Sequence, residues 1–159
     1  MPVFSDIVVG FEDYRMLSPL LSVRVERNLF EVSRVNGCLE TLWEQQQLPD
    51  DGRMEVLLCV EEVLSNIIRH GCPGGDDDEV WVRADLAAGE IEIRIEDNGA
   101  AFDPLSHPSP RLDVQLQERR TGGLGVHLVR KLMDRITYER LAGRNCFSMA
   151  KKIATGMDT

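Results

Sequence analysis

The feature that most constrains the fold is an apolar segment, residues 56–71, whose hydrophobic residues recur every three or four positions. Its apolar side holds Val56, Leu57, Val60, Val63, Leu64, Ile67 and Ile68. A carboxylate, a carboxamide and an imidazole follow one another at i, i+4 and i+8, in Glu62, Asn66 and His70. At about 100° per residue these three groups share one quadrant of a helix. The pattern predicts an amphipathic helix, whose polar side on this observation alone is a solvated surface.

Two later segments change that interpretation. Residues 91–103 alternate apolar and charged residues as a half-buried strand does, and then break at the turn signal Asp97-Asn98-Gly99. Residues 121–133 run from a glycine cluster directly into a helical pattern. The free backbone N–H groups at such a helix start can bind an anion. Each segment alone is common, as a hairpin turn or a helix entry, but all three in this order are not.

Together these residues resemble the nucleotide-binding domains of the GHKL superfamily and, within it, the anti-sigma-factor serine kinases of the RsbW type. Residues 62–71 look like the N box of that family, and residues 97–103 look like its first glycine box. Residues 123–129 are similar to the second glycine box, and residues 145–149 to the closing strand of the sheet. The resemblance covers residues 20–152, which is nearly the whole chain.

The resemblance implies a role for each matching position, with ATP and Mg²⁺ as cofactors. Glu62 would be the general base that takes a proton from the attacking hydroxyl. Asn66 would supply its side-chain oxygen to Mg²⁺, and Asp97 would accept a hydrogen bond from the adenine amino group. Gly99 would let the backbone pass close to the base. The other nucleotide-binding residues it implies are Arg69, His70, Phe102, Arg120, Gly123, Leu124, Gly125 and Ser148.

The chain departs from the family pattern at two positions. Ala101 stands where many members have a second glycine, so we expect a loop less free to take a positive φ or to approach the ligand closely. Ser148 stands where threonine is usual; it keeps a hydroxyl for the base pocket and loses a methyl group.

The function implied by the resemblance is an ATP-dependent protein serine kinase that is also an anti-sigma factor. Its partners would be a small anti-anti-sigma protein of STAS type, which it phosphorylates, and a sigma factor, and the chain would form a homodimer. Two alternatives stay open: a nucleotide-gated anti-sigma binding module without kinase activity, and a catalytic domain of histidine-kinase type. A dinucleotide-binding Rossmann motif at 123–125 is excluded, because a proline-broken polar loop precedes the glycines and Leu128 stands at the third glycine position.

Composition narrows the class further. The 159 residues are enough for one domain, and the net charge of −9 argues against direct binding to nucleic acid or to an anionic membrane. Lysine occurs only at 131, 151 and 152, which excludes a P-loop. The four cysteines lack metal-ligand spacing. Without a signal sequence or a long apolar run, the expected compartment is the cytoplasm.

The order of the expected elements is strand, helix, helix, two strands, helix, two strands. This order predicts a two-layer α/β sandwich, with helices on one face of a mixed, mainly antiparallel sheet. We expect an N-terminal arm at 1–17, the ATP-binding domain at 18–153 and a C-terminal tail at 154–159. Residues 104–120, with three prolines and no periodicity, are expected to form the ATP lid between the two glycine boxes.

Overall fold

The computed structural model describes residues 19–71, 77–106 and 123–153. The expected arm and tail lie outside the described residues, as does Arg120. Of the expected lid, only the start is described, where Pro104–Ser106 form a single 3₁₀ turn, η2. Among the described residues, no helix combines the length and the hydropathy that a membrane span requires.

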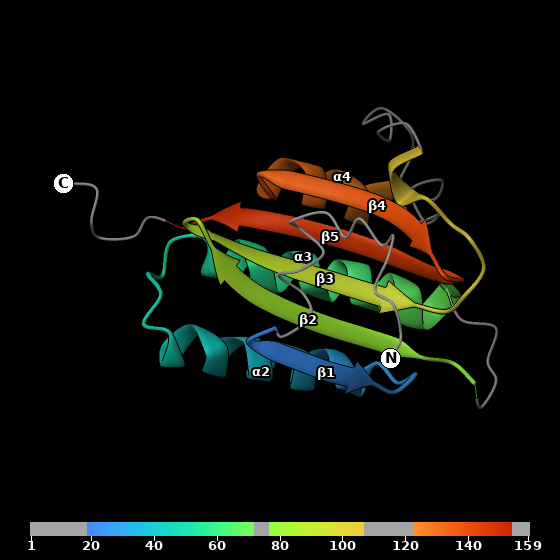
Figure 1. The fold of residues 1–159 in the computed structure, drawn as a ribbon, viewed down its shortest axis with the longest axis horizontal. Coiled ribbons are helices and arrows are strands. Elements are labelled where there is room, and N and C mark those ends of the chain that lie inside the picture. Colours follow the sequence, from blue (N-terminus) through green and yellow to red (C-terminus); the bar gives the residue numbers. More distant parts are fainter. Residues whose placement is uncertain (1–18, 72–76, 107–122, 154–159) are drawn as a thin grey trace, which may run out of the picture.

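A five-stranded sheet forms one layer of the molecule (Figure 1). Its strands are β1 (Leu21–Val25), β2 (Val80–Ala87), β3 (Glu90–Asp97), β4 (Arg135–Leu141) and β5 (Arg144–Lys152). Their spatial order is β1-β2-β3-β5-β4, and every neighbouring pair is antiparallel. In the last hairpin, therefore, the first strand, β4, forms the edge of the sheet, and the second strand, β5, lies inside it, next to β3.

Three helices form the second layer, all on the same face of the sheet (Figure 1). They are α2 (Phe30–Gln45), α3 (Arg53–Asn66) and α4 (Gly123–Leu132), and α3 lies between the other two. The buried core lies between the layers, where Trp43, Leu39 and Leu64 pack against the isoleucines of β3. The expected order of elements and the two-layer α/β sandwich are therefore confirmed.

The face of the sheet away from the helices carries charge rather than a second core. Arg94 of β3 lies 3.0 Å from Glu96 and 3.5 Å from Glu139 of β4. Arg83 of β2 pairs with Glu96 as well, and its guanidinium stacks 5.2 Å from the ring centre of Trp81. Cross-strand pairs of opposite charge on one face help to hold the register of neighbouring strands.

The central helix does not end in a regular way. After Asn66 the chain continues into a π-helical turn, η1 (Ile67–Gly71), rather than a simple helix end. Arg27, in the connection before α2, donates from Nε to the carbonyl oxygen of Ile68 at 3.2 Å. Single π turns of this kind are frequent at functional sites. This one brings Gly71 toward the end of β3.

Candidate functional site

The start of α4 packs directly against the polar side of α3. A Cβ atom placed on Gly125 would lie 3.0 Å from Oε2 of Glu62 and 3.1 Å from Nδ2 of Asn66. Only glycine therefore leaves the two side chains undisturbed at this position. The structure thus brings the second glycine segment together with the carboxylate and carboxamide that the sequence analysis paired.

Glu62 and Asn66 are partly buried, and within the described residues neither side chain makes a hydrogen bond or an ion pair. A carboxylate and a carboxamide that face a helix start without internal partners can serve a ligand instead. The nearby backbone N–H groups at the start of α4 favour a negatively charged one. This end of the site therefore fits phosphate together with a hard cation such as Mg²⁺, which prefers oxygen ligands.

Asp97 ends β3 at the other end of the site. It is only 4% exposed, and its Oδ1 accepts hydrogen bonds from the Gly99 N–H and from Nδ2 of Asn145, both at 3.0 Å. Both hydrogen bonds go to Oδ1, and none from a described residue goes to Oδ2. Burial raises the pKa of this carboxyl, while the two hydrogen bonds and the nearby Arg140 oppose the rise. One oxygen is thus held by the protein, and the other is left to accept a hydrogen bond.

The two residues after Asp97 tie the turn to other parts of the chain. Oδ1 of Asn98 accepts from the Glu79 N–H at 2.8 Å, and its Nδ2 donates to the carbonyl of Asp77 at 2.6 Å. Gly99 meets the π turn, because a Cβ there would lie only 1.9 Å from the carbonyl oxygen of Gly71. Asp97-Asn98-Gly99 is therefore a junction of three segments and not a hairpin turn.

The helix α3 with its π turn forms one side of the site along its whole length. Glu62 and Asn66 contact the start of α4, and Gly71 contacts the turn that follows β3. At about 1.5 Å per residue, Glu62 and Gly71 lie on the order of 13 Å apart along the helix axis. That separation suits an extended nucleotide, with its base beside Asp97 and its phosphates beside Gly125.

Several expected site residues are not drawn into this group by described contacts. Arg69 and His70 are exposed on η1, and their side chains form no hydrogen bond or ion pair with another described residue. Phe102 is 58% exposed, although its N–H donates to Oδ1 of Asn145 at 3.3 Å. Gly123 and Leu124 form the first turn of α4, but the surroundings of these two residues are not among the described features. Arg120 lies outside the described residues.

Ser148, which was expected to complete the base pocket, does not lie on the side of the sheet that carries Asp97. Ser148 of β5 lies directly opposite Arg94 of β3. Asp97 lies on the other face of the sheet, together with the core isoleucines of β3. Side chains directly opposite one another in an antiparallel pair point to the same face. Ser148 therefore belongs to the charged face. The period-two alternation of Phe147 and Met149, both buried in the core, was the sequence signal for this orientation.

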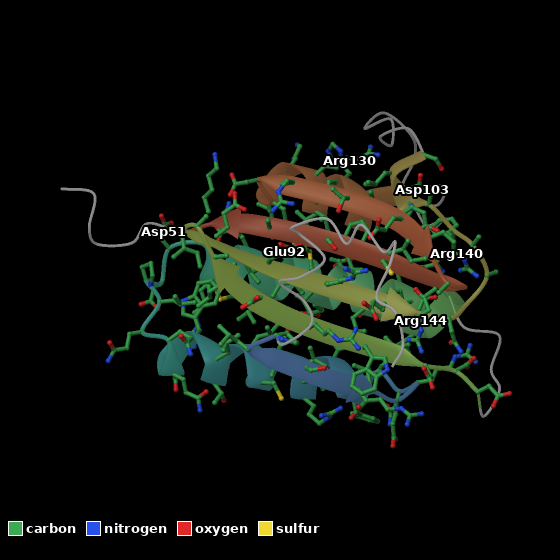
Figure 2. The ribbon with its side chains drawn as sticks, viewed as in Figure 1. Asp51, Glu92, Asp103, Arg130, Arg140 and Arg144 are labelled. Atoms are coloured by element: carbon green, nitrogen blue, oxygen red, sulfur yellow. The ribbon has the colours of Figure 1, made fainter. Side chains whose placement is uncertain are left out.

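The residue that does stand beside Asp97 is Asn145, which the sequence analysis did not select. It is directly opposite Asp97 in the β3–β5 register, and Arg140 is directly opposite Asn145 in the β4–β5 register. Arg140 donates from Nη1 to the Gly99 carbonyl at 2.8 Å. Figure 2 shows Arg140 and Arg144 at one end of the sheet and Asp51 at the other. The row of Asp97, Asn145 and Arg140 follows from the strand register, which no local sequence pattern supplies.

The expected effect of Ala101 also needs correction. Neither Gly99 nor Ala101 has a positive φ, so this loop does not use the left-handed conformation that glycine favours. Gly99 is required for space beside Gly71, whereas Ala101 is exposed. An alanine at 101 therefore causes no backbone strain of that kind.

Comparison with known proteins agrees with this geometry. Residues 25–151 match the histidine kinase-like ATPase domain family. The chain is 32% identical over 102 residues to a serine/threonine-protein kinase, BtrW, of Bordetella bronchiseptica, covering 64% of this chain and 72% of that protein. It is 31% identical over 84 residues to the serine-protein kinase RsbW of Listeria monocytogenes, covering 50% of this chain and 54% of that protein.

Two further similarities bear on the same region. An anti-sigma F factor of Halalkalibacterium halodurans is 26% identical over 99 residues, covering 61% of this chain and 68% of that protein. Among solved structures, a chain of the SiaB-SiaC complex of Pseudomonas aeruginosa aligns with a TM-score of 0.55 at 16% identity. That alignment covers 93% of this chain and 98% of the other, and at this identity it shows a shared fold.

Proposed function

Since this chain belongs to the histidine kinase-like ATPase domain family, we propose that it is an ATP-dependent protein serine kinase that also acts as an anti-sigma factor. The observation that carries the proposal is the contact of Gly125 with Glu62 and Asn66. A carboxylate without a partner among the described residues thus lies beside a helix start that suits phosphate. The names of the relatives, which are serine kinases and an anti-sigma factor, support the same assignment.

Base recognition is assigned to Asp97. Its Oδ2 would accept a hydrogen bond from the amino group of adenine, because the other oxygen is already occupied by Gly99 and Asn145. The phosphates would lie at the start of α4, where the backbone N–H groups of the first turn are not used within the helix. Asn66 would hold Mg²⁺ through its side-chain oxygen. When bound, that ion neutralises charge on the phosphate oxygens.

Glu62 is assigned as the general base. It would take the proton from the hydroxyl of a serine in the substrate protein, whose oxygen then bonds to the γ-phosphorus. As that bond forms, the bond from the γ-phosphorus to the bridging β–γ oxygen breaks, and ADP leaves. Partial burial beside Gly125 keeps the carboxylate close to the start of α4, the phosphate end of the site, where the phosphates are proposed to lie.

The proposed protein substrate is a small anti-anti-sigma protein of STAS type, and the competing partner is a sigma factor. An acidic chain with a net charge of −9 favours basic or mixed protein surfaces as partners. A homodimer is proposed from the family resemblance. The mass of the protein in solution, measured by light scattering, tests the homodimer separately from the kinase activity.

The test of the proposed function is incubation of the purified chain with γ-labelled ATP and candidate small antagonist proteins. We expect label on a serine of one antagonist, and no label when that serine is replaced by alanine. Capture of the sigma factor is measured in parallel by a pull-down. A chain that captures a sigma factor but labels no antagonist would be a nucleotide-gated binding module, and the kinase assignment would be wrong.

A further inference from the structure

The tip of the β4–β5 hairpin is bonded to the loop that follows Asp97. Asn145 is 6% exposed, and its carboxamide makes four hydrogen bonds. Its Oδ1 accepts from the Tyr138 hydroxyl at 2.6 Å and from the Phe102 N–H at 3.3 Å. Its Nδ2 donates to Oδ1 of Asp97 at 3.0 Å and to the carbonyl oxygen of Ala100 at 2.9 Å. The Phe102 N–H can only donate and the Ala100 carbonyl can only accept, so these two partners fix which end of the carboxamide is oxygen and which is nitrogen.

These bonds enclose the position where the first glycine box usually has its second glycine. The carbonyl of Ala100 and the N–H of Phe102 lie on either side of Ala101, and both are bonded to the same carboxamide. Arg140 adds a third point of attachment, because its Nη1 donates to the carbonyl of Gly99. The loop 97–102 is thus held by side chains of one hairpin and does not depend on glycine at 101.

The same arrangement decides which oxygen of Asp97 is presented. Asn145 occupies Oδ1 together with the Gly99 N–H, and Oδ2 has no bond to a described residue. Without the carboxamide, the carboxylate would lose its only side-chain hydrogen-bond donor among the described residues, and rotation about its χ2 angle would be less restricted. A hydrogen-bond acceptor held in one orientation distinguishes a base that can donate from a base that cannot.

We propose that Asn145 and Arg140 form a hairpin clamp, a pair of positioning residues that orients Asp97 and the loop 97–102 and so sets the selectivity of the site for adenine. The clamp rests on the proposed function only in requiring that an adenine nucleotide binds beside Asp97. It does not depend on phosphate transfer.

The test compares the binding of ATP and of ITP by calorimetry, using the full chain. ITP carries a carbonyl oxygen in place of the amino group of ATP and so cannot donate to Asp97. We expect the wild-type protein to prefer ATP. Asn145→Ala should lower ATP affinity by about tenfold or more. The reason is that the hydrogen bond from the adenine amino group to the Asp97 carboxylate is weakened once that carboxylate is no longer held in one orientation. ITP affinity should stay within about twofold, since the phosphate end of the site is unchanged.

A matched control is Thr137→Ala. Thr137 lies on the same hairpin, is exposed and faces the charged side of the sheet opposite Ser148. It should leave both affinities at their wild-type values. If Asn145→Ala instead lowers ATP and ITP affinities by the same factor, Asn145 has only a structural role and the clamp is overturned.

A second variant keeps the test valid if Asn145→Ala does not fold. Arg140 is exposed, so Arg140→Ala removes its bond to Gly99 without opening the core. We expect ATP affinity to fall by about threefold, with ITP affinity less affected, and Arg140→Lys, which restores a donor, to recover part of the loss. An unchanged ATP-to-ITP ratio in Arg140→Ala would contradict the clamp.

The outcomes for the clamp and for the kinase assignment are separable. A wild-type protein that selects ATP over ITP, with selectivity lost in the clamp variants, supports the clamp even if it transfers no phosphate. A wild-type protein that binds ATP and ITP equally overturns the clamp even if it phosphorylates an antagonist.

Discussion

The two ends of the candidate site are built differently. At the base end, Asp97 and the loop after it are hydrogen-bonded to the residue before β2 and to β4 and β5, Gly99 packs against the π turn, and one oxygen of the carboxylate accepts two hydrogen bonds. At the phosphate end, the side chains of Glu62 and Asn66 lie against Gly125 but make no hydrogen bond or ion pair with a described residue. A base has a constant shape that a rigid surface can match in advance. In the proposed function, groups that act on a transferring phosphoryl need partners that the ligand supplies, and this agrees with the lack of described partners for these two side chains.

The largest expected effect falls at the phosphate end. Glu62→Gln keeps the size of the side chain and removes its basic character, so we expect phosphate transfer to the antagonist to fall by about 10²–10⁴-fold. ATP affinity and sigma-factor capture should stay close to wild type. Single-turnover transfer of labelled phosphate measures the first, and calorimetry with a pull-down measures the others. Transfer at the wild-type rate would place the general base at another residue.

The next largest effect distinguishes the two glycines. Gly99→Ala places a Cβ 1.9 Å from the carbonyl oxygen of Gly71, a backbone atom that cannot move alone. We expect the free energy of unfolding to fall by roughly 1–3 kcal/mol.

Gly125→Ala is the matched change at the other end. Its two closest contacts would be with the ends of the Glu62 and Asn66 side chains, which can rotate away. We expect no loss of stability, because alanine favours a helix by up to about 1 kcal/mol over glycine, but reduced phosphate transfer. Urea unfolding and the transfer assay together measure the difference. Equal destabilisation by both changes would contradict a rigid base end and an adaptable phosphate end.

A third prediction concerns pH. Burial raises the pKa of Asp97 in the folded protein, so the folded state binds that proton more tightly than the unfolded chain does. The stabilisation from the proton is complete below the unfolded pKa, about 4, and is lost as the pH rises through the folded pKa. Asp97→Asn removes this dependence.

We therefore expect the nucleotide-free Asp97→Asn protein to gain stability relative to wild type as the pH rises above about 4, while its ATP affinity falls. Thermal unfolding across that range, with calorimetry at pH 7, measures both. A stability difference that does not change with pH would mean that the carboxyl is not perturbed by burial.

The smallest effect is expected for Ser148→Ala. Because Ser148 lies on the charged face, we expect ATP affinity to be unchanged and stability to stay within about 0.5 kcal/mol of wild type. Calorimetry and urea unfolding check this. A severalfold loss of ATP affinity would return Ser148 to the base pocket and would contradict the register observed here.

The sequence by itself determined the order of the elements, the two-layer fold and the segments that meet at the site. Periodicity is a local property, so the helix bearing Glu62 and Asn66 and the strand ending in Asp97 could be located from their own residues. The family resemblance then indicated which ends would meet, and the contact between Gly125 and Glu62 agrees with it.

Only the tertiary structure decided which residues stand beside Asp97. The row of Asp97, Asn145 and Arg140 depends on how β5 is inserted between β3 and β4, and a shift of one residue in that register would exchange the two faces. The close approach of Gly99 to Gly71 likewise joins residues that lie far apart in the chain. Strand alternation fixes the relative orientation of neighbouring residues, but the packing of the whole sheet against the helices selects their partners.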